Sequence, residues 1–197
     1  HVSPEEFVTL AETSGLMPQL TDYVLETALA QVAEWRCSGL EVPVAVNVSP
    51  RDVHTPGFAG SIAARLARHK VPPGALQLEI TEHVLLDDPQ RAADALAGLT
   101  GHGVRMSLDD FGTGYSSLAH LRRLPVSELK IDRSFVARLL LDAEDAEIVR
   151  HTVELAHSLG LVVVAEGVED KETWERLRGL GCDAVQGWLV AAAMPPE

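Results

Sequence analysis

The stretch VRMSLDDFGTGYSS, residues 104–117, carries the pattern on which the fold prediction rests. A mostly apolar run ends in two adjacent aspartates, and a segment with two glycines follows. Asp and Gly are common in turns, so Asp109 and Asp110 alone are equally compatible with a solvated turn. A buried pair of neighbouring carboxylates is costly unless a cation or a proton compensates the charge. The rest of the chain decides between these interpretations.

Similar apolar runs, rich in Val, Ile and Leu, recur along the chain. Strands are expected near residues 42–49, 75–81, 104–110, 127–132, 161–168 and 184–190. Helices are expected near residues 17–35, 57–69, 88–100, 143–159 and 171–180, after a first helix with Ser3 as N-cap, Pro4 at its first position and Glu6 closing a capping box. Near-continuous apolar strands that alternate with helices indicate a parallel sheet.

Two architectures produce this alternation, a closed (β/α)8 barrel and an open doubly wound sheet. No GxGxxG motif follows any of the strands, so the dinucleotide-binding form of the open sheet has no support. We therefore expect an α/β fold, a (β/α)8 TIM-like barrel, with residues 1–197 as a single domain. Such barrels usually have eight strands in about 250 residues, so the first two strands are expected upstream of His1 and six parallel strands lie in this chain.

Composition and charge narrow the possible ligands. The formal net charge is −13, from 16 Lys and Arg against 29 Asp and Glu, which would repel duplex DNA and long RNA. A small phosphorylated ligand stays possible because a metal ion can reverse the charge of one site. No apolar run approaches the ~20 residues that span a bilayer. Cys37 and Cys182 form no CxxC motif and the eight histidines no HxH or HExxH motif, so any metal site is expected to use oxygen ligands.

Polar residues of types useful for chemistry occur at or near the C-terminal end of every expected strand. In chain order they are Asn47, Glu79 with Glu82, Asp109 with Asp110, Lys130 with Asp132, Glu166 with Glu169, and Gln186. Barrel enzymes collect their active sites at this face. The carboxylates and the amide among these residues are ligands that suit Mg²⁺ or Mn²⁺. Adjacent aspartates can bridge two ions, an arrangement that supports phosphoester hydrolysis.

Structural roles are the alternative for these residues. Lys130 can hold a nucleophilic water or neutralise a phosphate oxygen, but it can also form a structural ion pair with Asp132 inside the barrel. Glu79 or Glu166 taken alone can be a hydrogen-bonded structural carboxylate. Their convergence on one face favours the catalytic interpretation, in which cations offset the charge of the paired aspartates.

Six motifs, in this order and spacing, closely resemble the EAL-domain family of bacterial cyclic-di-GMP phosphodiesterases: VNVS, LEITE, SLDDFGTGYSSL, LKIDRSFV, VVAEGVE and GCDAVQGWL. The resemblance runs from VSPEEFVTLAE to MPPE. It implies a (β/α)8-type barrel with an irregular, antiparallel first strand. It also implies that two Mg²⁺ or Mn²⁺ ions support hydrolysis of one phosphodiester of cyclic di-GMP, giving linear pGpG.

The resemblance further implies roles for individual residues. Four are similar to the family's metal ligands: Asn47, Glu79, Asp109 and Asp110. Lys130 is similar to the lysine that contacts the attacking water, and Glu166 matches the glutamate assigned to metal binding or to general-base catalysis. Glu82 resembles the residue that steadies the loop after Asp110. Three further residues fit roles in contacting the nucleotide or supporting the ligands: Asp132, Glu169 and Gln186.

Two departures from the family pattern stand out. The Glu-Ala-Leu motif and the nearby Leu-x-Arg, which supply a metal ligand and a phosphate contact, are not in this chain and are expected shortly before His1. The chain as given therefore lacks one ligand of the expected site. Residues 191–193, all alanine, stand where the family commonly has Ser-Arg-Pro, so an arginine is lost.

We expect an active phosphodiesterase, because each catalytic position present carries the matching residue type. The alternatives are a receptor that binds cyclic di-GMP without cleaving it, a protein-interaction module that binds no nucleotide, and a phosphodiesterase for another substrate. The resemblance also implies a homodimer, with fused sensory or regulatory domains outside this chain. We expect a cytoplasmic domain, which segments outside this chain can anchor to a membrane.

Overall fold

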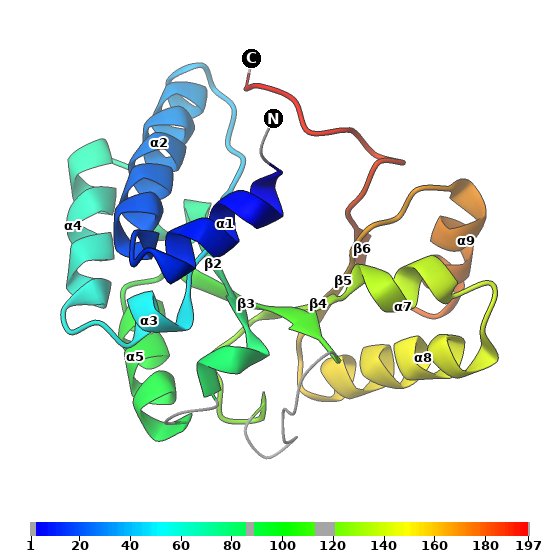
Figure 1. Ribbon diagram of the computed structural model, residues 1–197. Helices are drawn as coiled ribbons and strands as arrows, with labels where there is room; N and C mark the ends of the chain where they lie inside the picture. The colour runs from blue at the N-terminus through cyan, green and yellow to red at the C-terminus, as the bar shows by residue number, and fades with distance from the viewer. Residues whose placement is uncertain (1–2, 86–88, 113–120, 197) are drawn as a thin grey trace. The chain divides into compact units, whose positions relative to one another are not determined.

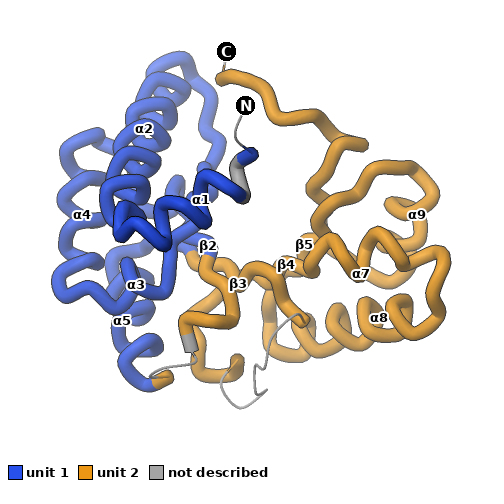
Figure 2. Tube along the Cα trace, in the orientation of Figure 1, with its two compact units in different colours: residues 1–79, 90–105 blue, residues 80–89, 106–197 orange. Residues whose placement is uncertain are grey.

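The structure is a computed structural model that describes residues 3–85, 89–112 and 121–196 (Figure 1). It divides into two compact units (Figure 2). The first contains residues 1–79 and 90–105, and the second contains residues 80–89 and 106–197. Among the described residues, no helix has the length and apolar character that a membrane crossing requires.

Six parallel strands follow one another in the sheet in the same order as in the chain. They are β1 (Val44–Asn47), β2 (Leu76–Thr81), β3 (Arg105–Phe111), β4 (Glu128–Ile131), β5 (Val162–Ala165) and β6 (Ala184–Val185). A doubly wound sheet reverses its strand order at a switch point. The sequential order has no reversal, so it confirms the α/β fold of the (β/α)8 TIM-like type.

Two helices precede β1, and the other described helices lie in the connections between the strands. They are α1 (Pro4–Thr13), α2 (Met17–Cys37), α3 (Pro50–Val53), α4 (Phe58–His69), α5 (Pro89–Gly101), α7 (Arg133–Arg138), α8 (Ala143–Ser158) and α9 (Lys171–Gly179), with short 3-10 turns η1 (Pro73–Ala75) and η2 (Glu82–Leu85). The capping box of α1 is confirmed: the Glu6 N–H donates to Ser3 Oγ at 3.2 Å, and the Ser3 N–H donates to Glu6 Oε2 at 3.0 Å.

The core is formed by apolar residues at alternate positions of the strands and by one face of each long helix. In the first unit, Leu76 and Leu78 of β2 are fully buried, as are Leu25 and Leu29 of α2. In the second unit the same is true of Met106, Leu108, Leu129 and Ile131 in β3 and β4. Each such side chain stabilises the fold by roughly 1.5–3 kcal/mol relative to exposure. The strands are thereby fixed, and their C-terminal residues with them.

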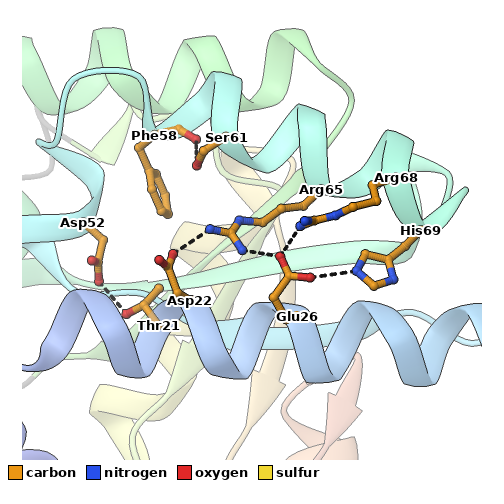
Figure 3. Close-up of polar contacts among 9 residues, drawn as sticks. All are labelled: Thr21, Asp22, Glu26, Asp52, Phe58, Ser61, Arg65, Arg68 and His69. Carbon is orange, nitrogen blue, oxygen red and sulfur yellow. Dashed lines mark hydrogen bonds and ion pairs between the residues drawn. The ribbon is translucent and has the colours of Figure 1, made fainter.

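An ion-pair network joins α2 to α4 within the first unit (Figure 3). Glu26 of α2 accepts hydrogen bonds from Arg65 and Arg68 of α4, and its Oε2 lies 2.9 Å from Nε2 of His69. Arg65 also donates to Asp22 at 2.7 Å. The hydrogen bond to His69, helped by Arg65 and Arg68, keeps the pKa of Glu26 below its usual value although burial acts to raise it. The network therefore links α4 to α2 at the edge of their packed faces.

The last strand is shorter than expected. Residues 184–190 were expected to be extended, but β6 ends at Val185. The N–H groups of Val190 and Ala191 both donate to the carbonyl of Gly187, at 3.0 and 3.3 Å. These bonds close a turn, which takes the chain out of the ladder after Gln186.

Candidate active site

In the first unit, Asn47 and Glu79 lie side by side on neighbouring strands, Asn47 at the end of β1 and Glu79 in the C-terminal half of β2. Asn47 is the last residue of β1, and the parallel register places it opposite Glu79 of β2. The Val48 N–H donates to the Glu79 carbonyl at 2.9 Å, which continues the ladder past Asn47. Glu79 is 7% exposed. The sheet therefore brings these two predicted oxygen ligands side by side.

In the second unit, three carboxylates converge. Asp109 and Asp110 lie near the end of β3, and Glu166 directly follows β5. One carboxylate oxygen of each lies within 4.8 Å of the others. β4 lies between β3 and β5 in the sheet, so the cluster is built by strand order rather than by sequence proximity.

Lys130 of β4 lies among these carboxylates. Its side chain is 4% exposed, its Nζ is 3.3 Å from Oδ1 of Asp109, and it forms an ion pair with Oε1 of Glu166. Asp132, the other partner considered from the sequence, is the N-cap of α7 and accepts a hydrogen bond from the Ser134 N–H at 2.9 Å. Lys130 thus compensates part of the negative charge of the cluster and is oriented by two carboxylates, one in β3 and one directly after β5.

A local change of backbone conformation brings the two aspartates together. Successive side chains of a regular strand point to opposite faces of the sheet. Asp110 has φ of 54°, in the left-handed region, and the β3–β4 register shifts between Leu108 and Phe111. The Asp110 N–H donates to Oδ1 of Asp109 at 3.1 Å. The strand alternation is thereby broken, and both carboxylates reach the same cluster.

The crowding of negative charge perturbs Asp110. Burial, together with the charges of Asp109, Asp132 and Glu166, raises its pKa from 3.8 to about 6. A divalent cation would relieve this repulsion, and all three carboxylates offer the oxygen atoms that Mg²⁺ and Mn²⁺ prefer. The donor set of Asp109, Asp110 and Glu166 therefore fits a magnesium or manganese site.

Three further predicted residues, Glu82, Glu169 and Gln186, also belong to the second unit. Glu82, 5% exposed at the start of η2, accepts a hydrogen bond from the Gly112 N–H at 2.8 Å. The rest of that loop, residues 113–120, lies outside the described residues. Glu169 is exposed and lines a cavity of about 340 Å³ together with Arg133 and Ser134. Gln186 directly follows β6, and its N–H donates to the Ala165 carbonyl at 2.8 Å.

Sequence reasoning missed the short helix α7 and its contacts. Asp132 accepts hydrogen bonds from both the N–H and the hydroxyl of Ser134. An Asp followed two residues later by a Ser, directly after a strand, is a helix N-cap signal that was available in the sequence.

Comparison with known proteins identifies the family. The EAL domain family model matches residues 1–193. The chain is 43% identical over 197 residues to the bifunctional diguanylate cyclase/cyclic di-GMP phosphodiesterase MucR of Pseudomonas aeruginosa, covering 100% of this chain and 29% of that protein. It is 40% identical to the cyclic di-GMP phosphodiesterase PA2567 of the same organism, covering 100% of this chain and 33% of that protein. The chain thus spans about a third of the length of these relatives.

Solved structures agree with the sequence comparison. The structure of the PaMucR phosphodiesterase in a c-di-GMP complex matches with a TM-score of 0.94 and 43% identity, covering 98% of this chain and 78% of that one. The same fold therefore accompanies the same motifs. On these grounds the chain belongs to the EAL domain family.

Proposed function

We propose that this chain is part of a metal-dependent phosphodiesterase that hydrolyses one phosphodiester of cyclic di-GMP to give linear pGpG. The main observation that supports this proposal is the cluster of Asp109, Asp110 and Glu166 around the buried Lys130. Relatives that are 43% and 40% identical over the whole chain are named cyclic di-GMP phosphodiesterases, and a close structural neighbour is a c-di-GMP complex. The names of the relatives and the ligand of the structural neighbour indicate the same substrate, cyclic di-GMP.

The metal ligands that we propose are Asn47, Glu79, Asp109, Asp110 and Glu166. All offer carboxylate or amide oxygen, which suits two Mg²⁺ or Mn²⁺ ions. Bound divalent ions would lower the pKa of a water and stabilise the departing 3′ oxygen. The raised pKa of Asp110, caused by burial and then by Asp109, Asp132 and Glu166, supports the need for added positive charge here.

Lys130 and Glu166 are the proposed catalytic residues. The ion pairs with Asp109 and Glu166 hold the Lys130 ammonium in one orientation, so it can donate a hydrogen bond to the attacking water. Glu166 can accept a hydrogen bond from the same water and orient it for attack on phosphorus. Water adds to phosphorus as the bond to the 3′ oxygen breaks, and that oxygen takes up a proton. Glu169, Asp132 and Gln186 are proposed to contact the nucleotide or to support the ligands, and Glu82 to steady the loop after Asp110.

The test is a hydrolysis assay on the full-length protein. Cyclic di-GMP is incubated with Mg²⁺ or Mn²⁺ and pGpG is followed by chromatography, with Asp109→Ala as the variant and Asp94→Ala as the control. Asp94 is an exposed aspartate of α5 that accepts a hydrogen bond from Gln90 at 3.0 Å. We expect metal-dependent pGpG from the wild type and from Asp94→Ala, and none from folded Asp109→Ala.

Nucleotide binding in Ca²⁺ is measured in parallel. If the protein binds cyclic di-GMP but forms no pGpG with any divalent metal, it is a receptor for cyclic di-GMP and not a phosphodiesterase. If it neither binds nor hydrolyses cyclic di-GMP, it is a protein-interaction module on the same barrel. Full turnover by Asp109→Ala would remove this aspartate from the metal site.

Further proposals concern assembly. We propose that both compact units belong to one domain, since the family model spans them. We propose a homodimer, which light scattering on the purified protein would detect. We also propose fused sensory or regulatory domains outside this chain, because it covers only 29% and 33% of two whole-chain relatives.

A further inference from the structure

The first turn of α7, residues 132–135, contacts the two segments that carry Asp110 and Glu166. These carboxylates come from β3 and from the end of β5, which are not neighbours in the sheet. β4 lies between them, and α7 directly follows β4. Ile131, the last residue of β4, is in register with Phe111, and its carbonyl accepts the Glu166 N–H at 3.1 Å. The turn therefore begins directly after a residue of β4 that is paired with both segments.

On one side, Phe135 packs against Gly112, two residues after Asp110. A Cβ atom added to Gly112 would lie 2.9 Å from Cε2 of Phe135, and the three nearest atoms all belong to that ring. Gly112 has φ of 101°, so the backbone also requires glycine here. Glu82 holds the Gly112 N–H at 2.8 Å from another direction. Gly112 is thus enclosed between the Phe135 ring and the Glu82 carboxylate.

On the other side, Arg133 packs against Gly167, the residue after Glu166. A Cβ atom added to Gly167 would lie 2.7 Å from Cβ and 3.5 Å from Cα of Arg133. Gly167 has φ of 67°. The approach uses atoms close to the α7 backbone, so it does not depend on the flexible end of the arginine.

Between these contacts, Asp132 fixes the start of the turn. Its carboxylate accepts the N–H and the hydroxyl of Ser134. The turn thus contacts the Asp110 segment through Phe135 and the Glu166 segment through Arg133. Because packed side chains resist displacement, such contacts fix the spacing of the groups they touch.

We propose that the first turn of α7 sets the spacing between Asp110 and Glu166, and that Phe135 is the positioning residue that acts through Gly112. This inference rests on the proposed function, since the spacing matters because both carboxylates bind metal. Groups that support metal ligands from outside typically affect affinity by about 10–100-fold. Phe135 touches no substrate in this scheme, so it is a positioning residue and not a catalytic one.

The test measures Mn²⁺ affinity of the nucleotide-free, full-length protein, together with its melting temperature. Phe135→Ala should bind Mn²⁺ about tenfold more weakly than the wild type. Phe135→Tyr keeps the ring and should restore wild-type affinity. Val136→Ala is the matched control, because Val136 is a 1% exposed residue of the same helix. It should lower the melting temperature and leave Mn²⁺ affinity unchanged.

The outcomes separate this inference from the proposed function. Wild-type Mn²⁺ affinity in Phe135→Ala, or an equal loss of affinity in Val136→Ala, would overturn the inference while hydrolysis by the wild type still stands. Wild-type protein that binds Mn²⁺ but makes no pGpG would overturn the proposed function alone. Wild-type protein that binds no Mn²⁺ would overturn both. If Phe135→Ala fails to fold, Phe135→Leu decides by the same comparison.

Discussion

At the scale of single residues, Asp110 has two unusual properties, a left-handed backbone conformation and a raised pKa. Its left-handed backbone, with φ of 54°, places its carboxylate beside Asp109 and Glu166. Burial and the neighbouring negative charges then raise its pKa to about 6. Such conformations cost about 1–3 kcal/mol in residues other than glycine and persist where surrounding contacts enforce them. The cost is consistent with a position where geometry serves binding.

The raised pKa of Asp110 predicts a pH-dependent effect of Asp110→Asn. Ionisation of Asp110 destabilises the folded state, and this loss appears as the pH rises from its ordinary pKa of 3.8 through the folded value of about 6. Asparagine tolerates the left-handed conformation and carries no charge. Without metal, Asp110→Asn should therefore melt about 2 °C above the wild type near pH 7, with no difference near pH 4. Equal melting of the two proteins in EDTA near pH 7 would contradict this prediction.

Lys130 supplies a second prediction at this scale. Its ammonium is buried between Asp109 and Glu166, whose side chains are 11% and 18% exposed. Lys130→Met would leave two carboxylates without this cation, and removing one partner of a buried pair costs about 3 kcal/mol. Urea unfolding in EDTA should show this loss, and Mn²⁺ should recover part of it by restoring positive charge. Lys171→Met, at a side chain that is 74% exposed, is the control and should unfold like the wild type.

At the scale of elements, sequence patterns located most strands and helices to within a few residues. The Ser3 and Glu6 capping box was predicted and is present. A second capping box, Ser49 and Asp52 at α3, has the same Ser-Pro start and was missed. The reason is length: α3 spans only Pro50–Val53, too short to show helical periodicity. The expected length of β6 is too great, because the apolar residues after Val185 resemble a continuing strand.

Asp52 carries the prediction at the scale of elements. Its carboxylate joins α3 to α2 by accepting the Thr21 hydroxyl at 2.8 Å, and it also accepts the N–H and hydroxyl of Ser49 (Figure 3 shows the Thr21 contact). Asp52 is 5% exposed, so Asp52→Ala would leave buried donors unsatisfied at a cost of about 2 kcal/mol. Denaturant unfolding should show this loss, while Asp94→Ala, on an exposed face of α5, should change stability little. If Asp52→Ala lowers the free energy of unfolding no more than Asp94→Ala does, the Asp52 contacts between α3 and α2 do not stabilise the fold as proposed.

At the scale of the whole molecule, metal binding should be visible as stability. A ligand at about 100 times its dissociation constant stabilises the folded state by about 2.7 kcal/mol, which corresponds to about 5–10 °C in melting temperature at this size. Mn²⁺ should raise the melting temperature by this order and EDTA should reverse the increase. Asp109→Asn should abolish the shift, since Asp109 lies in the carboxylate cluster. An unchanged shift in this variant would place the metal elsewhere.

By itself, the sequence determined the alternation of strands and helices, the parallel sheet, and the oxygen-rich set of candidate ligands at the strand ends. These follow from local periodicity, which each segment carries independently. Only the tertiary structure decided that Asp110 adopts a left-handed conformation, that Lys130 pairs with both Asp109 and Glu166, and that Phe135 packs on Gly112. Each of these depends on strand order and on packing between residues distant in the chain. No local pattern encodes such contacts, because their free energy arises only when the sheet has formed.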